Sequence, residues 1–228
     1  MSFLCCCFQS HSSEEERQHI LGAAQSARIP HPSPKGSPDR IGMITARHVG
    51  VPDLDQRFTD FAEMFNTQQE SYECMQEKRK TLMVRYCCAP DSSLSECLQK
   101  MKDEHNDHQI ILQLKGYNFG LAVTPDDSVP DKLKQTQENI KELCQAVKAI
   151  MALGPKLEEM INWLLNSEKI LTQKVNAEAK THQESTRLRG NLRENLREAS
   201  RAKRFSPRYR EEAGKLFNEV AMLSGIKP

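Results

Sequence analysis

Apolar residues recur at alternating steps of three and four along residues 53–88. Those that we expect at a helix interface are Phe58, Phe61, Phe65 and Tyr72. An α-helix repeats every 3.6 residues, so this spacing predicts one long helix with a single apolar face. Pro90 disfavours helical conformation in the residue before it and should end the helix. Asp91 or Ser92 can cap a second helix, so residues 52–106 are predicted to form paired helices or a helical hairpin.

A period of two replaces the helical period in residues 107–130. The alternating apolar residues form two sets, Ile110, Leu112, Leu114 and Phe119, Leu121, Val123. Gly116 and Asn118 lie between the two sets, where a tight turn is expected. A structureless loop of this length is uncommon inside a compact domain. The segment is therefore predicted to be a β-hairpin or another ordered connection.

A second helical pattern covers residues 131–204. Gly154 and Pro155 interrupt it with residues typical of a helix end and a helix start, which predicts two nearly collinear helices or one kinked helix. At 1.5 Å per residue, residues 155–203 alone would span roughly 73 Å. The apolar series becomes sparse beyond Val175, so we expect this part to project or to await a partner. Pro207 then predicts a separate amphipathic helix within residues 205–228.

Trp163 lies in residues 161–171, a segment that resembles the first helix of a spectrin-type repeat. Because tryptophan buries a large area, we expect Trp163 to anchor a helix interface together with Ile161 and Leu164. The predicted fold is mostly α: an elongated helical or coiled-coil bundle with a small β-hairpin insertion. A disordered tail, residues 1–51, is predicted to precede it because serine, proline, glycine and histidine replace any apolar period there.

The tip of this tail has three consecutive cysteines, Cys5, Cys6 and Cys7, among apolar residues. It resembles the cysteine-rich N-terminal tips of acylated cytosolic proteins, which implies S-acylation at these thiols. One acyl chain anchors a protein only marginally, so two or three adjacent sites would convert transient contact into stable residence. Ser2 excludes N-myristoylation. The alternative is a disordered tip whose cysteines are incidental, and the acidic run at residues 14–16 would be repelled by an anionic leaflet.

Two serines in the tail, Ser33 and Ser37, precede prolines and are candidate phosphorylation sites. The alternative is a flexible spacer in which such dipeptides are common. The cysteines lack the spacing of a disulfide framework or of a zinc ribbon, and no secretory signal pattern is present. We therefore expect a reduced, cytosolic protein, with its location on the cytoplasmic face of a membrane if the tip is acylated.

The whole chain carries a net charge of only +1, with 38% apolar residues and no apolar run long enough to span a bilayer. Positive charge is concentrated locally, because residues 187–210 contain nine arginines and lysines against two glutamates. This segment predicts an anionic partner, such as lipid or an acidic protein surface, and a solvated helix face is the alternative. We do not expect nucleic acid, since no RNA-binding motif accompanies the charge. The predicted binding residues are Arg187, Arg189, Arg193, Arg197, Arg201, Lys203 and Arg204.

The sequence contains none of the common catalytic motifs, so we assign no catalytic residue, no metal site and no cofactor. Glu104, His105, Asp107 and His108 form the only compact titratable group that we can identify. The preferred hypothesis is a non-enzymatic adaptor or scaffold, tethered to a membrane by N-terminal S-acylation and binding a helical partner or a second copy. The alternative is a soluble cytoskeletal or multisubunit-complex component that uses the basic C-terminal helix. A small enzyme built around residues 104–108 is a third hypothesis.

Overall fold

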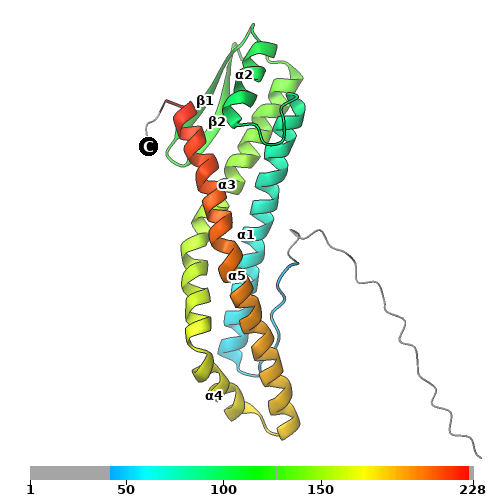
Figure 1. Ribbon diagram of the computed structural model, residues 1–228, viewed down its shortest axis with the longest axis vertical. Helices are drawn as coiled ribbons and strands as arrows, with labels where there is room; N and C mark the ends of the chain where they lie inside the picture. Colours follow the sequence, from blue (N-terminus) through cyan, green and yellow to red (C-terminus); the bar gives the residue numbers. More distant parts are fainter. Residues whose placement is uncertain (1–41, 127, 226–228) are drawn as a thin grey trace, which may run out of the picture. The chain divides into compact units, whose positions relative to one another are not determined.

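The computed structural model describes residues 42–126 and 128–225, which are mostly helical with one small antiparallel hairpin (Figure 1). The predicted S-acylation and phosphorylation sites, Cys5, Cys6, Cys7, Ser33 and Ser37, lie outside the described residues. The chain divides into two units, residues 1–41 and 42–228, and the description below concerns the second. Its elements are α1 (Pro52–Arg85), α2 (Leu94–Glu104), β1 (Gln109–Lys115), β2 (Asn118–Thr124), α3 (Asp131–Asn166), α4 (Glu168–Glu178) and α5 (His182–Leu223).

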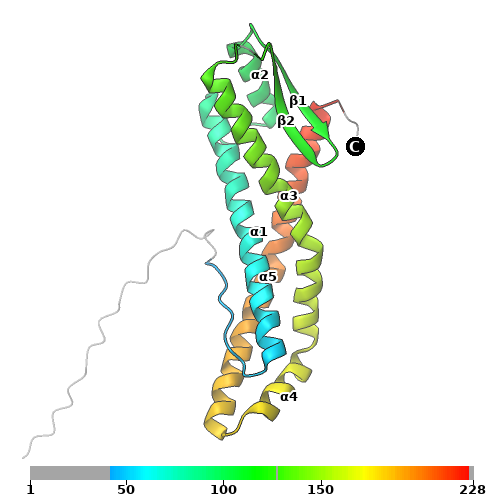
Figure 2. The same ribbon diagram turned by 180° about the vertical axis from the view of Figure 1, so that it is seen from behind.

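Three long helices, α1, α3 and α5, pack side by side (Figures 1 and 2). The chain runs up α1, down α3 and up α5. The long helix predicted from the phenylalanine pattern is present as α1, and Phe58, Phe61 and Phe65 are almost completely buried. Burying a phenylalanine stabilises the folded state by about 1.5–3 kcal/mol, so this row is a main source of cohesion between the helices.

The end of α1 is closed by backbone hydrogen bonds that use a cysteine in an unusual conformation. Cys87 has a φ of +51°. The amide of Cys87 donates to the carbonyl of Val84, and the amide of Cys88 donates to the carbonyl of Met83. These two bonds form a Schellman motif, in which glycine is normally preferred because left-handed backbone crowds a side chain.

The short helix α2 begins at a cap supplied partly by another helix. The cap is Ser93 and not the predicted Asp91 or Ser92, and its hydroxyl accepts a hydrogen bond from the amide of Glu96. The carboxylate of Glu219 on α5 accepts a second one from the amide of Leu94 at 2.6 Å. Negative charge at a helix start is favourable, so Glu219 ties α2 to α5.

The predicted β-hairpin is confirmed. Leu112 pairs with Leu121, and the two-residue turn has Gly116 at a φ of +60°, which glycine adopts without strain. The alternating apolar residues of the two predicted sets are buried or half-buried, as the period of two indicates, whereas Ile111 between them is 42% exposed. On β2, the amide of Phe119 donates to the sulfur of Cys144 on α3. The hairpin is thus held against the helices, which a two-stranded sheet needs in order to be stable.

Gly154 and Pro155 do not break the helix: α3 runs through both residues. A Cβ at Gly154 would lie 2.0 Å from Cδ of Arg210, so this glycine makes room for a side chain of α5. Arg210 passes over Gly154 and forms an ion pair with Glu158 at 2.7 Å. The glycine therefore serves interhelical packing and not helix termination.

The chain reverses after α4, at residues 179–181, which the sequence analysis places inside a helical segment. Thr181 accepts a hydrogen bond from the amide of Glu184, and the carboxylate of Glu184 accepts one from the amide of Lys180. Such reciprocal side-chain bonds resemble a capping box and favour a helix start. This turn brings α5 back along α3.

The prediction that the chain projects beyond Val175 is therefore wrong, as is the prediction of a separate helix after residue 204. α5 is a single helix that contains Pro207. Small and apolar residues on both sides of the proline, including Ala202, Tyr209 and Ala213, are buried. Their packing on the neighbouring helices offsets the hydrogen bond that proline removes.

Residues 42–49, which we call the strap, are ordered, although the sequence analysis assigns them to the disordered tail. Figure 2 shows the strap (blue) running beside the first half of α1 and along α5. Ile44 is 4% exposed and Val49 is fully buried. Side-chain amides of the helices satisfy the backbone of the strap, so it is held in place without belonging to a sheet.

Candidate functional site

Five exposed arginines form a row along α5, which we call the arginine face: Arg189, Arg193, Arg197, Arg204 and Arg208. Each step between neighbours is four or seven residues, which keeps all five on one side of an α-helix. The row spans about 29 Å at 1.5 Å per residue. Four of the five residues belong to the predicted anionic-partner site, and the structure adds Arg208.

The arginine face is exposed because the opposite side of α5 is buried. Leu188, Leu192, Leu196 and Ala199 are at most 7% exposed and belong to the apolar side of the helix. α5 contacts α1, α3 and α4, and these contacts fix its orientation about its own axis. The apolar positions of the helix thereby direct the arginines towards solvent.

Few of these arginines have an acidic partner. Within the described part of the chain, no carboxylate lies within 4.0 Å of the guanidinium groups of Arg189, Arg193, Arg204 or Arg208. Arg197 approaches Glu194 at 3.8 Å, but its side chain is 77% exposed, and such a surface pair contributes little. The charge of the row is therefore available to an external anion.

The other predicted basic residues have different surroundings. Arg187 and Lys203 are exposed outside the row. Arg201 is largely covered: it forms an ion pair with Glu198 at 2.6 Å and donates to the carbonyl of Gly42. Arg201 therefore helps to hold the strap in place, and it is not part of the arginine face.

The predicted helix-interface residues fall into two groups. Phe58, Phe61, Phe65, Ile161 and Leu164 are buried, whereas Tyr72 is half-buried and stacks on Tyr209 with ring centroids 4.2 Å apart. Burial raises the pKa of the Tyr72 hydroxyl to about 12, and its hydrogen bond to Glu212 acts in the same direction.

Trp163 is not a core residue, because 38% of it is exposed. The guanidinium of Arg57 covers its ring at 4.5 Å from the centroid, a cation–π contact that joins α1 to α3. One face of the indole is therefore covered by Arg57, and the rest of the Trp163 side chain is partly open to solvent. Ile170 on the next helix, α4, is also exposed, at 57%.

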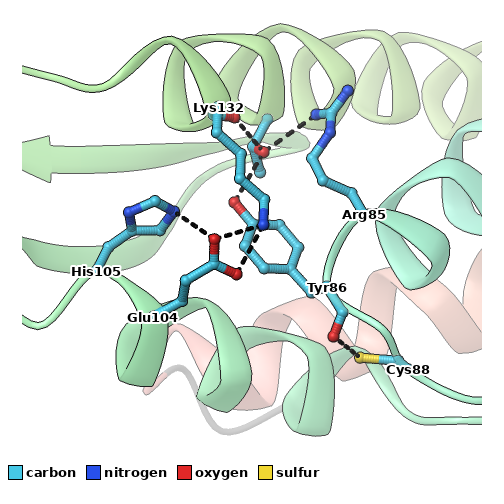
Figure 3. Close-up of polar contacts among 7 residues, drawn as sticks. Arg85, Tyr86, Cys88, Glu104, His105 and Lys132 are labelled. Atoms are coloured by element: carbon cyan, nitrogen blue, oxygen red, sulfur yellow. Dashed lines mark hydrogen bonds and ion pairs between the residues drawn. The ribbon is translucent and has the colours of Figure 1, made fainter.

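Within the titratable group at residues 104–108, Glu104 and His105 contact residues of other elements (Figure 3). The ammonium of Lys132 donates to both carboxylate oxygens of Glu104, at 2.5 and 2.7 Å, and lies over the ring of Tyr86. His105 packs edge-on against Tyr86, with Nε2 3.8 Å from Glu104. His108 lies elsewhere, near the carbonyl of Ser128. The arrangement joins α2 to the start of α3.

A second set of contacts in the same region completes this junction. The hydroxyl groups of Tyr86 and Thr136 are 3.0 Å apart, and Arg85 donates to Thr136 at 3.1 Å. Among residues 42–126 and 128–225, no group of three or more His, Cys, Asp or Glu side chains is arranged to hold a metal ion. In that same part of the chain, no helix is long and apolar enough to cross a membrane.

Comparisons with known proteins do not extend this picture. No protein-family model matches the chain, and neither the curated proteins nor the solved structures give a match. The arginine face of α5 is therefore interpreted from its own geometry and charge.

Proposed function

We propose that the protein is a non-enzymatic adaptor held on the cytoplasmic face of a membrane. In this proposal, acyl groups on Cys5, Cys6 and Cys7 anchor the chain, and the arginine face of α5 lies on the anionic headgroups. A helical partner or a second copy would bind the exposed surface of the helices, because their apolar seams are buried within the chain itself. The observation that carries the proposal is the row of five exposed arginines, four of which have no carboxylate within ion-pair distance.

The two attachments have complementary strengths. A single acyl chain binds a bilayer only marginally, with an association constant of about 10⁴ M⁻¹. Each basic residue near an anionic leaflet contributes about 1 kcal/mol, so five exposed arginines supply up to about 5 kcal/mol. A protein with one acyl chain and the arginine face would therefore stay at the membrane, whereas one acyl chain alone or the arginine face alone would exchange with the cytosol. Acylation at a second or third cysteine would strengthen the anchor further.

The test uses purified, unacylated full-length protein and phosphatidylcholine vesicles with or without phosphatidylserine. We expect binding only to the anionic vesicles, and we expect added salt to weaken it because salt screens exposed charges. Replacing Arg189, Arg193, Arg204 and Arg208 by glutamine should weaken binding by about a thousandfold, from about 1 kcal/mol per residue.

A matched control removes the same charge elsewhere. Lys80, Lys102, Lys115 and Lys156 are exposed and belong to other elements, so their replacement by glutamine leaves the arginine face intact. This control variant should bind anionic vesicles nearly as well as the wild type. Equal losses in the two variants would show that only overall charge matters, and binding that ignores phosphatidylserine would contradict the proposed role of the arginine face.

A further inference from the structure

Asparagine side chains hold the strap by its backbone. Asn66 on α1 accepts from the amide of Ile44 at 2.8 Å and donates to the carbonyl of the same residue at 2.9 Å. Asn195 on α5 makes the same pair of bonds to Arg47, both at 2.8 Å. Each asparagine thus forms hydrogen bonds with both the amide and the carbonyl of one residue. An extended chain of almost any sequence can make this pair of bonds.

Two further contacts extend this pattern along the strap. Asn191 on α5 donates to the carbonyl of His48 at 2.7 Å, and Asp55 on α1 accepts from the amide of Val49 at 2.6 Å. The groups that bind the strap therefore come from both α1 and α5. The strap runs antiparallel to both helices, since its numbering rises as theirs falls.

Only two side chains of the strap are buried against the helices. Ile44 is 4% exposed and Val49 is fully buried, and they lie five residues apart. Met43, Thr45 and Arg47 are exposed. The bound segment is therefore recognised mainly through backbone groups and two apolar anchors, which is how receptors for extended peptides combine affinity with limited specificity. One side-chain contact is added by His48, whose Nδ1 lies 2.7 Å from a carboxylate oxygen of Asp55.

A glycine separates the strap from α1. Gly50 has a φ of +80°, and a Cβ there would lie 2.9 Å from Leu188 on α5. Rotation about the backbone of Gly50 would release the strap and leave the start of α1 at Pro52 in place. Detachment of the strap would leave Asn66, Asn195 and Asn191 with free hydrogen-bonding groups along a groove between two helices.

We propose that α1 and α5 form a peptide-binding groove that the strap occupies in the free protein. Its ligand is an extended segment of a partner protein with apolar residues five positions apart, bound by Asn66 and Asn195 after it displaces the strap. The strap has the advantage of being attached, because a short link gives an effective concentration of the order of millimolar. A partner segment must therefore bind better than the strap or be presented at high local concentration.

The experiment uses the full chain and a fluorescent peptide with the sequence of residues 42–49. Wild-type protein should bind this peptide weakly, because the attached strap competes. A variant with a weakened strap, Ile44→Asp with Arg47→Pro, removes one apolar anchor and one amide donor without changing a helix. We expect this variant to bind the peptide at least about tenfold more tightly, as measured by fluorescence anisotropy.

Substitutions in the groove test the assigned contacts. In the weakened-strap background, Asn66→Ala and Asn195→Ala should each reduce peptide binding at least about tenfold, since each removes two hydrogen bonds. Asn218→Ala is the matched control, because Asn218 is an exposed asparagine of α5 that does not contact the strap. Peptide binding that is no tighter in the folded weakened-strap variant, or that survives both groove substitutions, would overturn the proposal.

A second measurement needs no substitution. Hydrogen exchange of the Ile44, Arg47 and Val49 amides can be followed in the wild-type protein while the peptide is added. Displacement predicts faster exchange of these amides as the peptide concentration rises. Unchanged exchange at peptide concentrations well above millimolar would also overturn the proposal, and a peptide with aspartate at both anchor positions should have no effect.

Discussion

Replacing Gly154 by alanine tests the packing of α3 on α5. Alanine is favoured over glycine inside a helix by about 1 kcal/mol, so a helical glycine without close neighbours should gain stability from this change. At Gly154 the added Cβ would lie 2.0 Å from Cδ of Arg210, and the arginine would have to move. The substitution therefore combines a local gain with the loss of an interhelical contact.

The size of this loss follows from what Arg210 does. Its ion pair with Glu158 is partly exposed, at 39% and 56% for the two side chains, and is worth at most about 1 kcal/mol. Its aliphatic stem adds about 0.8 kcal/mol for each methylene that leaves the surface of α3. We expect Gly154→Ala to be neutral or destabilising by about 1 kcal/mol.

A thermodynamic cycle separates the two terms. In an Arg210→Ala background the obstacle is gone, so Gly154→Ala should stabilise the protein by about 1 kcal/mol, giving a coupling energy of about 1–2 kcal/mol. Gly190→Ala and Gly214→Ala are matched controls in α5, because a Cβ at either position meets nothing within 4 Å. Urea unfolding followed by far-UV circular dichroism gives each free energy. An equal gain at all three glycines in the wild-type background would refute the packing of Arg210 on Gly154.

Three further predictions concern particular side chains. Cys87→Gly should raise the free energy of unfolding by about 1 kcal/mol in urea, because glycine tolerates the positive φ; an unchanged value would argue against the left-handed turn. Burial and the nearby Cys88 thiol raise the pKa of Cys97 to about 12. In native protein, Cys97 should therefore react with iodoacetamide at least about a hundredfold more slowly than exposed Cys87, as measured by mass spectrometry. Equal rates at the two cysteines would contradict this. The raised pKa of Tyr72 predicts a stabilising contribution that is complete below pH 10, the ordinary value, and is lost as the pH rises to about 12, since the unfolded chain releases this proton first. Tyr72→Phe should flatten that part of the stability profile, and an unaltered slope would count against the assignment.

The periods of apolar residues were enough to predict the class of fold. Phe58, Phe61 and Phe65 recur as a helix requires, and Leu112 and Leu121 belong to alternating runs that pair as a hairpin. These signals are local, because a helix or a hairpin buries one face whatever lies opposite. Mostly helical structure with a β-hairpin follows from them directly.

The boundaries between the later helices depend on contacts that a local pattern does not contain. Gly154 has the residue type of a helix end, but its role depends on Arg210, a residue far along the chain. The reversal at Thr181 has a local signal, the pair Thr181 and Glu184, which the spacing of apolar residues does not reveal. Pro207 is tolerated within α5 because its neighbours are buried on both sides, which also depends on tertiary packing.

The candidate site shows the same division. The concentration of arginines on residues 187–210 is evident in the sequence, and so is the expectation of an anionic partner. Which arginines face solvent depends on the packing of α5: Arg208 joins the row, whereas Arg201 is taken up by Glu198 and Gly42. The strap was missed because polar side chains of two distant helices, Asn66 and Asn195, hold it, and no apolar period marks such contacts.

The most direct test of membrane attachment is acyl-biotin exchange on the protein expressed in cells, combined with membrane fractionation. The wild type is compared with a variant in which Cys5, Cys6 and Cys7 are replaced by serine. We expect hydroxylamine-sensitive label on the wild type, and we expect label and stable membrane association to be lost together in the variant. A wild-type protein that carries no label and remains in the soluble fraction would contradict the account of an acyl-anchored adaptor.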